Sequence, residues 1–152
     1  MANEDVLTIE NGVVTKCKKN AVDVVIPAGV TEIGGWAFNG CKSLTSVVIP
    51  ESVKKIGWNA FEDCESLSSV VIPSSVKVIG DSGFYGLKLL RLVEIPYSVT
   101  VIGRSAFSGC TSLSEITYGC TVAQWNAVYK ASYWHNKVPA TVVKCSDGDV
   151  KL

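Results

Sequence analysis

The 152-residue sequence has no excess of either charge, a single histidine and no long apolar run. Its 14 basic residues balance its 14 acidic residues, so the basic surface typical of nucleic-acid-binding proteins is not expected. No apolar run approaches the ~18 residues of a membrane helix, which argues against membrane insertion. The start of the chain, MANEDVLTIENG, lacks the basic and apolar regions of a signal peptide. We therefore expect either a cytoplasmic protein or a mature fragment whose export signal was removed.

Residue patterns that support catalysis are scarce as well. The only histidine, His135, follows Trp134, where a local role in packing or contact with solvent is expected. Neither a G-x-S-x-G nucleophile motif nor a phosphate-binding G-x-x-x-x-G-K-[ST] motif is present. Asp147 and Asp149 flank a glycine, but Ca²⁺ requires about six or more oxygen ligands, so we expect an ordinary turn there. The sequence thus predicts no enzymatic activity, no cofactor and no bound metal.

The chain has instead a repeat of fixed length. Proline, isoleucine–glycine, phenylalanine and leucine each recur every 23 residues, four times over. The positions are Pro27, Pro50, Pro73 and Pro96; Ile33, Ile56, Ile79 and Ile102, each before a glycine; Phe38, Phe61, Phe84 and Phe107; and Leu44, Leu67, Leu90 and Leu113. A period of about 20–29 residues with apolar positions of the form L-x-x-V-x-I is typical of a leucine-rich repeat solenoid.

The second repeat, residues 47–69, shows how each unit is expected to fold. Residues 47–49 are valine, valine and isoleucine, which favours a short strand. Pro50 ends the strand because proline has no N–H for a continuing ladder. The chain reverses at Gly57, and Phe61 then follows in a helical or 3₁₀-like turn as the largest core residue. Short parallel strands on one face of the solenoid are therefore predicted, with each unit stabilised by its neighbours.

Different segments flank the repeats. Asn11-Gly12 lies between two β-rich runs and predicts an N-terminal hairpin. Beyond the last repeat, Thr121 is expected to cap a short helix, and residues 146–149 to form the turn of a closing hairpin. The predicted organisation is one structural domain. It comprises an N-terminal cap (1–23), four 23-residue repeats (24–116) and a C-terminal helix-plus-hairpin cap (117–152).

Six cysteines raise the question of disulfide bonds. Three of them, Cys41, Cys64 and Cys110, occupy one position of the repeat, where the third repeat has Leu87. A position that accepts leucine is apolar, and a free cysteine packs as a small hydrophobic residue, so buried thiols are favoured. Two bridges stay open as alternatives: one between Cys41 and Cys64 on adjacent rungs, and one between Cys120 and Cys145 in the C-terminal cap.

The repeat motif I-P-x-x-V-x-x-I-G-x-x-A-F-x-x-C-x-x-L-x-x-V resembles that of the BspA-like, or Treponema pallidum type, leucine-rich repeat family. The second repeat carries it at Ile49, Pro50, Val53, Ile56, Gly57, Ala60, Phe61, Cys64, Leu67 and Val70. The departures are Leu87 in place of cysteine, Gly83 in place of alanine, and Cys17 where an aromatic residue is expected. The resemblance covers nearly the whole chain and implies bacterial surface or secreted proteins, often adhesins, and hence an extracellular or cell-surface location. It is specific for fold and much less so for function, because repeat scaffolds bind unrelated partners.

Two sets of outward residues are candidate interaction sites. On the strand face we expect one row to contain Val25, Val48, Val71, Glu94 and Thr117. Its three adjacent valines reflect either β-propensity or a contact surface. At the turn after Ile-Gly, Trp36 and Trp58 lie on adjacent rungs and could touch diagonally. They would then form either a sugar-stacking or protein-binding platform or a cover for the core. Tyr85 and Tyr97 are weaker candidates of the same type.

The sequence therefore predicts a non-enzymatic module that binds a protein or a glycan through the strand face or the tryptophans, as in a bacterial adhesin. The alternative is a structural or self-assembling repeat scaffold, natural or engineered, without a dedicated ligand. In that case the valine row would pair with itself across a two-fold axis to form a homodimer. The identity of the partner does not follow from the residues.

Overall fold

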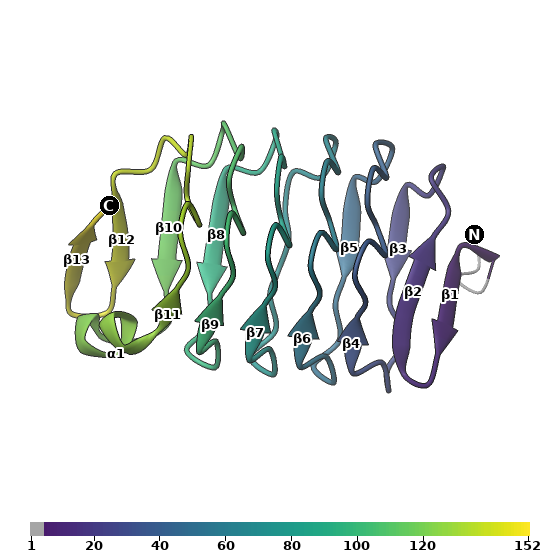
Figure 1. Cartoon of the computed structure of the whole chain (residues 1–152), viewed down its shortest axis with the longest axis horizontal. Coiled ribbons are helices and arrows are strands. Elements are labelled where there is room, and N and C mark those ends of the chain that lie inside the picture. Colours follow the sequence, from purple (N-terminus) through teal and green to yellow (C-terminus); the bar gives the residue numbers. More distant parts are fainter. Residues whose placement is uncertain (1–4) are drawn as a thin grey trace.

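Successive repeats stack side by side along the long axis of the molecule in the computed structural model, which describes residues 5–152. The N-terminal hairpin lies at one end of the stack, and the C-terminal helix and hairpin lie at the other (Figure 1). Each repeat forms one rung, so residues that are one repeat apart in the sequence meet on neighbouring rungs. The predicted leucine-rich solenoid with a cap at each end is confirmed.

The first side of the solenoid is the strand face that the sequence predicts. In the N-terminal half, β3 (Asp23–Val25) pairs in parallel with β5 (Ser46–Val48). In the C-terminal half, β8 (Leu92–Ile95), β10 (Glu115–Tyr118) and β12 (Val142–Cys145) pair in parallel, and β13 (Gly148–Lys151) closes the edge as an antiparallel strand. Between these two sheets the third repeat has no strand on this side of the solenoid, which the sequence pattern did not predict.

The second side carries a sheet that the sequence analysis missed, since it placed parallel strands on one face only. This seven-stranded sheet has the order β1 (Leu7–Glu10), β2 (Val13–Cys17), β4 (Glu32–Ile33), β6 (Lys55–Ile56), β7 (Val78–Ile79), β9 (Val101–Ile102) and β11 (Tyr129–Lys130). All pairs except β1–β2 are parallel. Five of its strands have two residues each, too few for an alternating pattern to show in the sequence.

The glycine after each isoleucine lets these two-residue strands approach closely. A Cβ atom at Gly57 would lie 2.7 Å from the backbone nitrogen of Gly35 and 2.8 Å from the carbonyl carbon of Gly34. Both distances are well below van der Waals contact, and both atoms belong to the backbone, which cannot rotate away. The Ile-Gly pair is therefore required by the close contact of adjacent backbones as well as by the reversal of the chain.

The third side consists of turns, as the spacing of Phe61 and Cys64 predicts. The Cys64 N–H donates to the Phe61 carbonyl within the turn, three residues back. Between rungs, the Trp36 N–H donates to the Trp58 carbonyl and the Phe38 N–H to the Ala60 carbonyl, at 3.0 and 2.7 Å. The turns thus form a hydrogen-bonded ladder of their own, which holds the rungs in register on this side.

A continuous column of aromatic rings fills the core. The rings of Phe38, Phe61, Phe84 and Phe107 are stacked with centroids 4.8, 5.4 and 5.3 Å apart, and all four side chains are fully buried. Trp134 packs edge-on against Phe107 at 6.4 Å and ends the column at the C-terminal side.

Cys17 occupies the phenylalanine position on the N-terminal rung. Its N–H donates to the Ala37 carbonyl, as the Phe38 N–H does to Ala60. In this register Cys17 lies at the N-terminal end of the aromatic column, where the other rungs have phenylalanine. The column therefore ends on a small side chain and not on another ring.

The two predicted caps are present. Asn11 and Gly12 connect β1 and β2 with φ angles of 51° and 77°, the left-handed values that a two-residue hairpin turn needs. The predicted helix is α1 (Val122–Ala127), and the Thr121 side chain accepts a hydrogen bond from the Gln124 N–H at 3.2 Å. Ser146 and Asp147 form the turn between β12 and β13. Within residues 5–152 no helix has the length and apolar character needed to cross a bilayer.

Candidate functional site

The strand face presents its outward side chains in straight rows, because the parallel strands are in register. Val25 lies opposite Val48, and Glu94 lies opposite Thr117. Val25, Val48 and Val71 have exposed fractions of 51%, 55% and 78%. These residues belong to the first outward row that the sequence predicts, whereas their role in binding stays a prediction. Leu92, in the neighbouring row, is 51% exposed and extends the apolar surface across β8.

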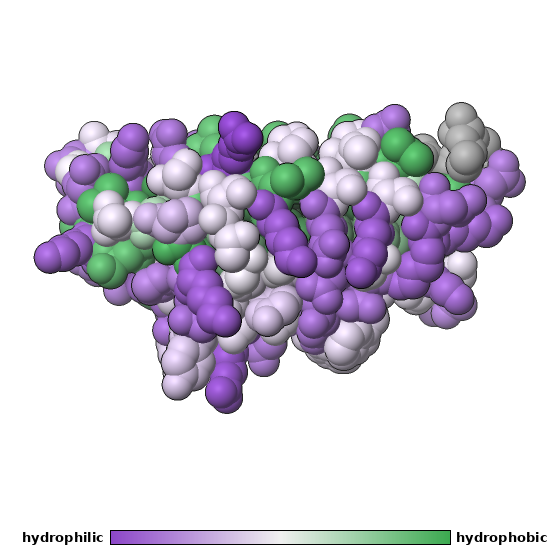
Figure 2. All heavy atoms as spheres, turned by 90° about the horizontal axis from the view of Figure 1, so that it is seen from above, coloured by the Kyte–Doolittle hydropathy of each residue, from purple (hydrophilic) through white to green (hydrophobic). Residues whose placement is uncertain are grey.

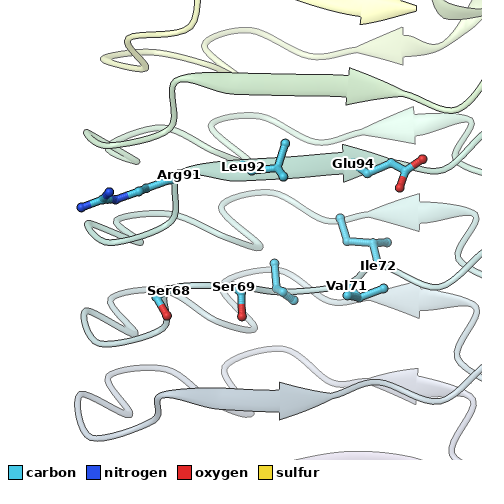
Figure 3. Close-up of a pocket in the computed structure, with 8 residues that line it drawn as sticks. Ser68, Ser69, Val71, Ile72, Arg91, Leu92 and Glu94 are labelled. Carbon is cyan, nitrogen blue, oxygen red and sulfur yellow. The ribbon is translucent and has the colours of Figure 1, made fainter. Parts of the chain in front are cut away.

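An open seam interrupts this face at the third repeat. Within residues 5–152, the segment Ser68–Ile72 makes no backbone hydrogen bond to β5 on one side or to β8 on the other. A groove of about 290 Å³ lies along the seam, and side chains of the segment line it on one side and Arg91, Leu92 and Glu94 on the other (Figure 3). The sequence gave no sign of this groove, because Val70 and Ile72 match the strand pattern of the other repeats.

Elsewhere the surface is mixed. Seen from the upper edge of Figure 1, apolar side chains form separate patches between hydrophilic ones (Figure 2). The four ion pairs of the described residues join exposed or half-exposed side chains: Lys42–Glu65, Lys88–Glu65, Lys55–Glu32 and Lys144–Glu115. Exposed pairs of this kind are worth about 0–1 kcal/mol each, so the surface charges contribute little to stability.

The two candidate tryptophans project from the turn side of the solenoid. Trp36 and Trp58 have exposed fractions of 54% and 53%. The structure records no contact between the two rings, so the diagonal contact considered from the sequence is not present among the described residues. The Trp58 indole instead lies against the backbone of Gly35: a Cβ atom there would be 2.6 Å from Cε2 and 2.7 Å from Nε1 of the ring.

Trp36 has an unusual backbone conformation. Its φ of 65° is left-handed, a region that a bulky side chain rarely occupies. The equivalent residues of the next three repeats, Asn59, Ser82 and Ser105, have φ values of 54–56° and are small or polar. The turn imposes this conformation on every rung. Among these four repeats only the first has a large aromatic residue there. Tyr133, aligned with Ser105 on the C-terminal rung, has a φ of 61° as well.

A polar cluster lies beside Trp36, with Asn39 on the same rung and Asn59 and Glu62 on the next. Asn59 and Asn39 both donate through Nδ2 to the Oε2 atom of Glu62, at 2.5 and 3.2 Å. Trp36 is aligned with Asn59, because the Trp36 N–H bonds to the carbonyl of the preceding residue, Trp58. Sequence reasoning missed this cluster. Its signal is present in the repeat alignment, where the three polar residues occupy outward positions of two adjacent turns.

The two candidate tyrosines lie apart from the tryptophans. Tyr85 is 37% exposed on the third rung, in the repeat position of Asn39 and Glu62. Tyr97, 63% exposed, follows the proline of the fourth repeat and borders a shallow groove of about 340 Å³ against α1. The structure therefore does not bring all the predicted site residues together, and it divides them among the strand face, the turn side and the C-terminal cap.

The cysteines of the repeat position form a buried column, as their exchange with leucine predicts. The Cys64 thiol donates to the Phe38 carbonyl, and the Cys110 thiol to the Phe84 carbonyl, each at 3.1 Å. Burial raises the pKa of Cys64 and of Cys110 from about 9 to about 12, so both thiols are neutral at physiological pH. A thiol at this position thus satisfies a buried carbonyl of the preceding rung as well as filling space.

All six cysteines are free thiols in this structure, including the two pairs considered for bridges. Cys120 and Cys145 are partly exposed and lie close together, because the Ser146 N–H donates to the Cys120 carbonyl at 2.9 Å. At the other end, the Cys17 thiol donates to the Lys18 carbonyl and the Cys41 thiol to the Cys17 carbonyl, at 3.6 and 3.9 Å. The neighbouring Cys41 thiol and burial raise the pKa of Cys17.

The groups considered for catalysis or metal binding have local partners. His135 packs edge-on against Trp134 at 4.6 Å, and burial lowers the pKa of its imidazole. Asp147 accepts a hydrogen bond from the Val122 N–H at 2.8 Å, so its carboxylate caps the first turn of α1. Within residues 5–152, no three side chains of the types that hold metals come together. The contacts of His135 and Asp147 are thus those of residues that build the C-terminal cap.

Comparisons with known proteins agree with the geometry. The family model described as the BspA type leucine-rich repeat region matches residues 7–133 with six copies, against the four regular 23-residue repeats marked by the sequence spacing. No curated protein matches the chain significantly.

Solved structures of similar proteins include a leucine-rich cell surface protein from Faecalibacterium prausnitzii, at 28% identity and a TM-score of 0.67. That alignment covers 79% of this chain and 38% of the other protein. The leucine-rich repeat protein of T. pallidum is 27% identical, with a TM-score of 0.56 over 69% of this chain and 62% of its own. A leucine-rich repeat protein from Bacteroides ovatus is also 27% identical, with a TM-score of 0.55 over 69% of this chain and 34% of its own. The chain thus spans less than two thirds of the length of each of these proteins.

Proposed function

Because the chain belongs to the BspA-type leucine-rich repeat family, we propose that it is a binding module of the bacterial cell surface and that its strand face binds a protein partner. The similarity to a cell surface protein of F. prausnitzii supports this location. A role in binding rather than catalysis is supported by the family and by the local partners of His135 and Asp147.

The observation that carries this proposal is the apolar centre of the strand face. Val48, Val71 and Leu92 lie on adjacent rungs, and each is more than half exposed. The solvent-facing side of a sheet usually carries polar side chains, so this apolar group is unusual. Charged residues lie toward both ends of this surface: Asp23 on the first rung, and Arg91, Glu94 and Glu115 on or beside the rung of Leu92. An apolar centre within a polar rim is the usual composition of a protein–protein interface.

The seam gives this surface a place for an anchoring side chain. Val71 and Leu92 line the groove, whose volume of about 290 Å³ suits a buried anchor from the partner. The backbone of Ser68–Ile72 offers N–H and C=O groups that no ladder uses. A partner that fills the groove and hydrogen bonds to this backbone would satisfy groups that now depend on water.

The proposal is tested with Val71→Glu, which places a charge at the most exposed apolar side chain of the face. Thr100→Glu, on the other sheet side of the solenoid, is the matched control. We expect saturable binding to at least one of a panel of immobilised extracellular matrix proteins. Val71→Glu should lower the affinity for that protein about tenfold or more, because it places a charge at the centre of the interface. Thr100→Glu should leave the affinity unchanged. Absence of saturable binding across the panel would contradict the proposal.

Light scattering over a hundredfold concentration range separates this proposal from self-association, the alternative role as a structural scaffold. A monomer at every concentration leaves the strand face available for an external partner and agrees with the proposal. A dimer that Val48→Glu abolishes would assign the face to a second copy of the chain. The proposal of a protein partner at that surface would then be wrong.

A further inference from the structure

We propose that Trp36 and Trp58, with the neighbouring polar cluster Asn39–Glu62–Asn59, form a second binding site, which takes a sugar ring of an uncharged glycan. This site lies on the turn side of the solenoid, so it is independent of the strand-face proposal. Its elements are two half-exposed indoles on adjacent rungs and a fixed set of hydrogen-bonding groups beside one of them.

The first support is the way in which the Trp58 ring is held. Its indole rests on Gly35, where any Cβ atom would collide with the ring, so the first repeat leaves space that the second repeat fills. The equivalent positions of the next two repeats are Asp81 and Arg104, where the Arg104 N–H donates to the Asp81 carboxylate at 2.8 Å. Although supported by the turn, Trp58 keeps 53% of its surface exposed, so the ring is positioned without being buried.

The second support is the strained backbone of Trp36. A bulky residue at a φ of 65° costs on the order of 1–2 kcal/mol, and asparagine or serine occupies the equivalent position of the next three repeats. Tyr133 has this conformation on the C-terminal rung, but there the Arg104 guanidinium lies over its ring at 5.6 Å. Burial of the side chain in the core does not offset this strain, because Trp36 is 54% exposed. Residues held in such conformations are concentrated at ligand sites, where the strain places a side chain that binding requires.

The third support is the chemistry of the cluster beside Trp36. Glu62 accepts from both Asn39 and Asn59 through Oε2, and no recorded hydrogen bond or ion pair in residues 5–152 involves its Oε1. Within the same residues no recorded hydrogen bond involves the side-chain carbonyl oxygen of Asn39 or Asn59. Aromatic faces bind the C–H face of a sugar ring, and amide and carboxylate groups bind its hydroxyls. The carboxylate of Glu62 disfavours acidic sugars, and the nearby Lys19 ammonium is already held by the Asn39 backbone carbonyl, so the ligand class is an uncharged glycan.

The test is titration of the purified chain with three uncharged oligosaccharides, cellohexaose, mannohexaose and chitohexaose, and with polygalacturonate as an acidic comparison. Binding is followed by tryptophan fluorescence, since Trp36 and Trp58 are exposed whereas Trp125 and Trp134 are buried. We expect saturable quenching by at least one of the uncharged sugars and none by polygalacturonate. Absence of saturable quenching by all three, or tighter binding of polygalacturonate, would overturn the inference.

Variants then locate the site and separate it from a structural role. Because fluorescence changes when tryptophan is removed, affinity of the variants is measured by calorimetry. Trp36→Ala and Trp58→Ala should each weaken binding about tenfold, as loss of an aromatic stacking partner does. Gly35→Ala keeps both rings but displaces the Trp58 indole, so it should weaken binding as well. Val71→Glu on the strand face is the control and should leave sugar binding unchanged, whatever its effect on a protein partner.

Two results would contradict the sugar site. If Trp36→Ala and Trp58→Ala lower the thermal unfolding temperature but leave sugar affinity intact, the rings serve to cover the rungs. If they abolish binding to a matrix protein and no sugar binds, the tryptophans are part of a protein interface. Loss of sugar affinity at an unchanged unfolding temperature would support the inference.

Discussion

Replacing Phe61 by alanine tests whether the aromatic column holds adjacent rungs together. Phe61 is fully buried and is stacked on Phe38 at 4.8 Å and on Phe84 at 5.4 Å. Removal of a buried phenylalanine side chain costs about 3–5 kcal/mol in unfolding free energy, through lost transfer energy and the cavity that remains. For a chain of this size, that loss corresponds to a fall of roughly 6–20 °C in the thermal midpoint.

Phe61→Leu separates the contribution of stacking from that of volume. Leucine keeps most of the buried apolar volume but removes both ring pairs, each worth about 0.5–1.5 kcal/mol beyond its buried area. We therefore expect a loss of about 1–3 kcal/mol, between the wild-type chain and the alanine variant.

Both variants are measured by denaturant unfolding, followed by circular dichroism and by tryptophan fluorescence. Coincident transitions with an unchanged slope would show that the whole stack unfolds as one unit and that the free energies can be compared. A loss below about 1 kcal/mol for Phe61→Ala would refute the reasoning, because it would mean that the rungs collapse around the cavity at little cost.

Two further predictions concern the backbone and the thiols. Gly57→Ala places a Cβ atom 2.7 Å from the Gly35 nitrogen and should cost about 1–3 kcal/mol in thermal unfolding. Gly119→Ala, with its nearest atom at 3.5 Å, is the control, and equal effects of the two would count against the close-packing argument. Burial raises the pKa of Cys64 and Cys110 from about 9 to about 12, so the stabilising effect of neutral thiols is complete below pH 9 and is lost as the pH rises toward 12. The double variant Cys64→Ala, Cys110→Ala should therefore lose less stability between pH 9 and 11 than the wild-type chain, and identical slopes would contradict this account.

Much of the fold follows from the spacing of a few residue types. The recurrence of Phe61 and its equivalents identifies the core column, and the exchange of cysteine with Leu87 identifies a second buried position. The hairpin at Asn11-Gly12 and the helix after Thr121 were predictable because turn and cap residues act locally. The sheet of two-residue strands was not, since its strands are held by contacts between rungs 23 residues apart.

The candidate sites were predicted less completely than the fold. Register alone places Val25 beside Val48 and makes Trp36 and Trp58 neighbours on adjacent rungs, so these residues could be named from the sequence. The support of Trp58 by Gly35 and the hydrogen bonds that join Asn39, Glu62 and Asn59 depend on side-chain conformations. Conformations of exposed side chains are decided by tertiary neighbours, which no spacing rule describes.

The solenoid, its core columns, its caps and its outward-facing residues all follow from the amino-acid pattern alone. These features repeat, and a period of 23 residues forces each residue to meet its own equivalent on the next rung. Only the tertiary structure decided where the repetition fails. Val70 and Ile72 are buried as the pattern requires, yet the backbone of their segment forms no ladder with β5 or β8, and the groove opens there. Hydrogen bonding between rungs depends on how closely whole strands approach, and that distance is set by the packing of the entire stack.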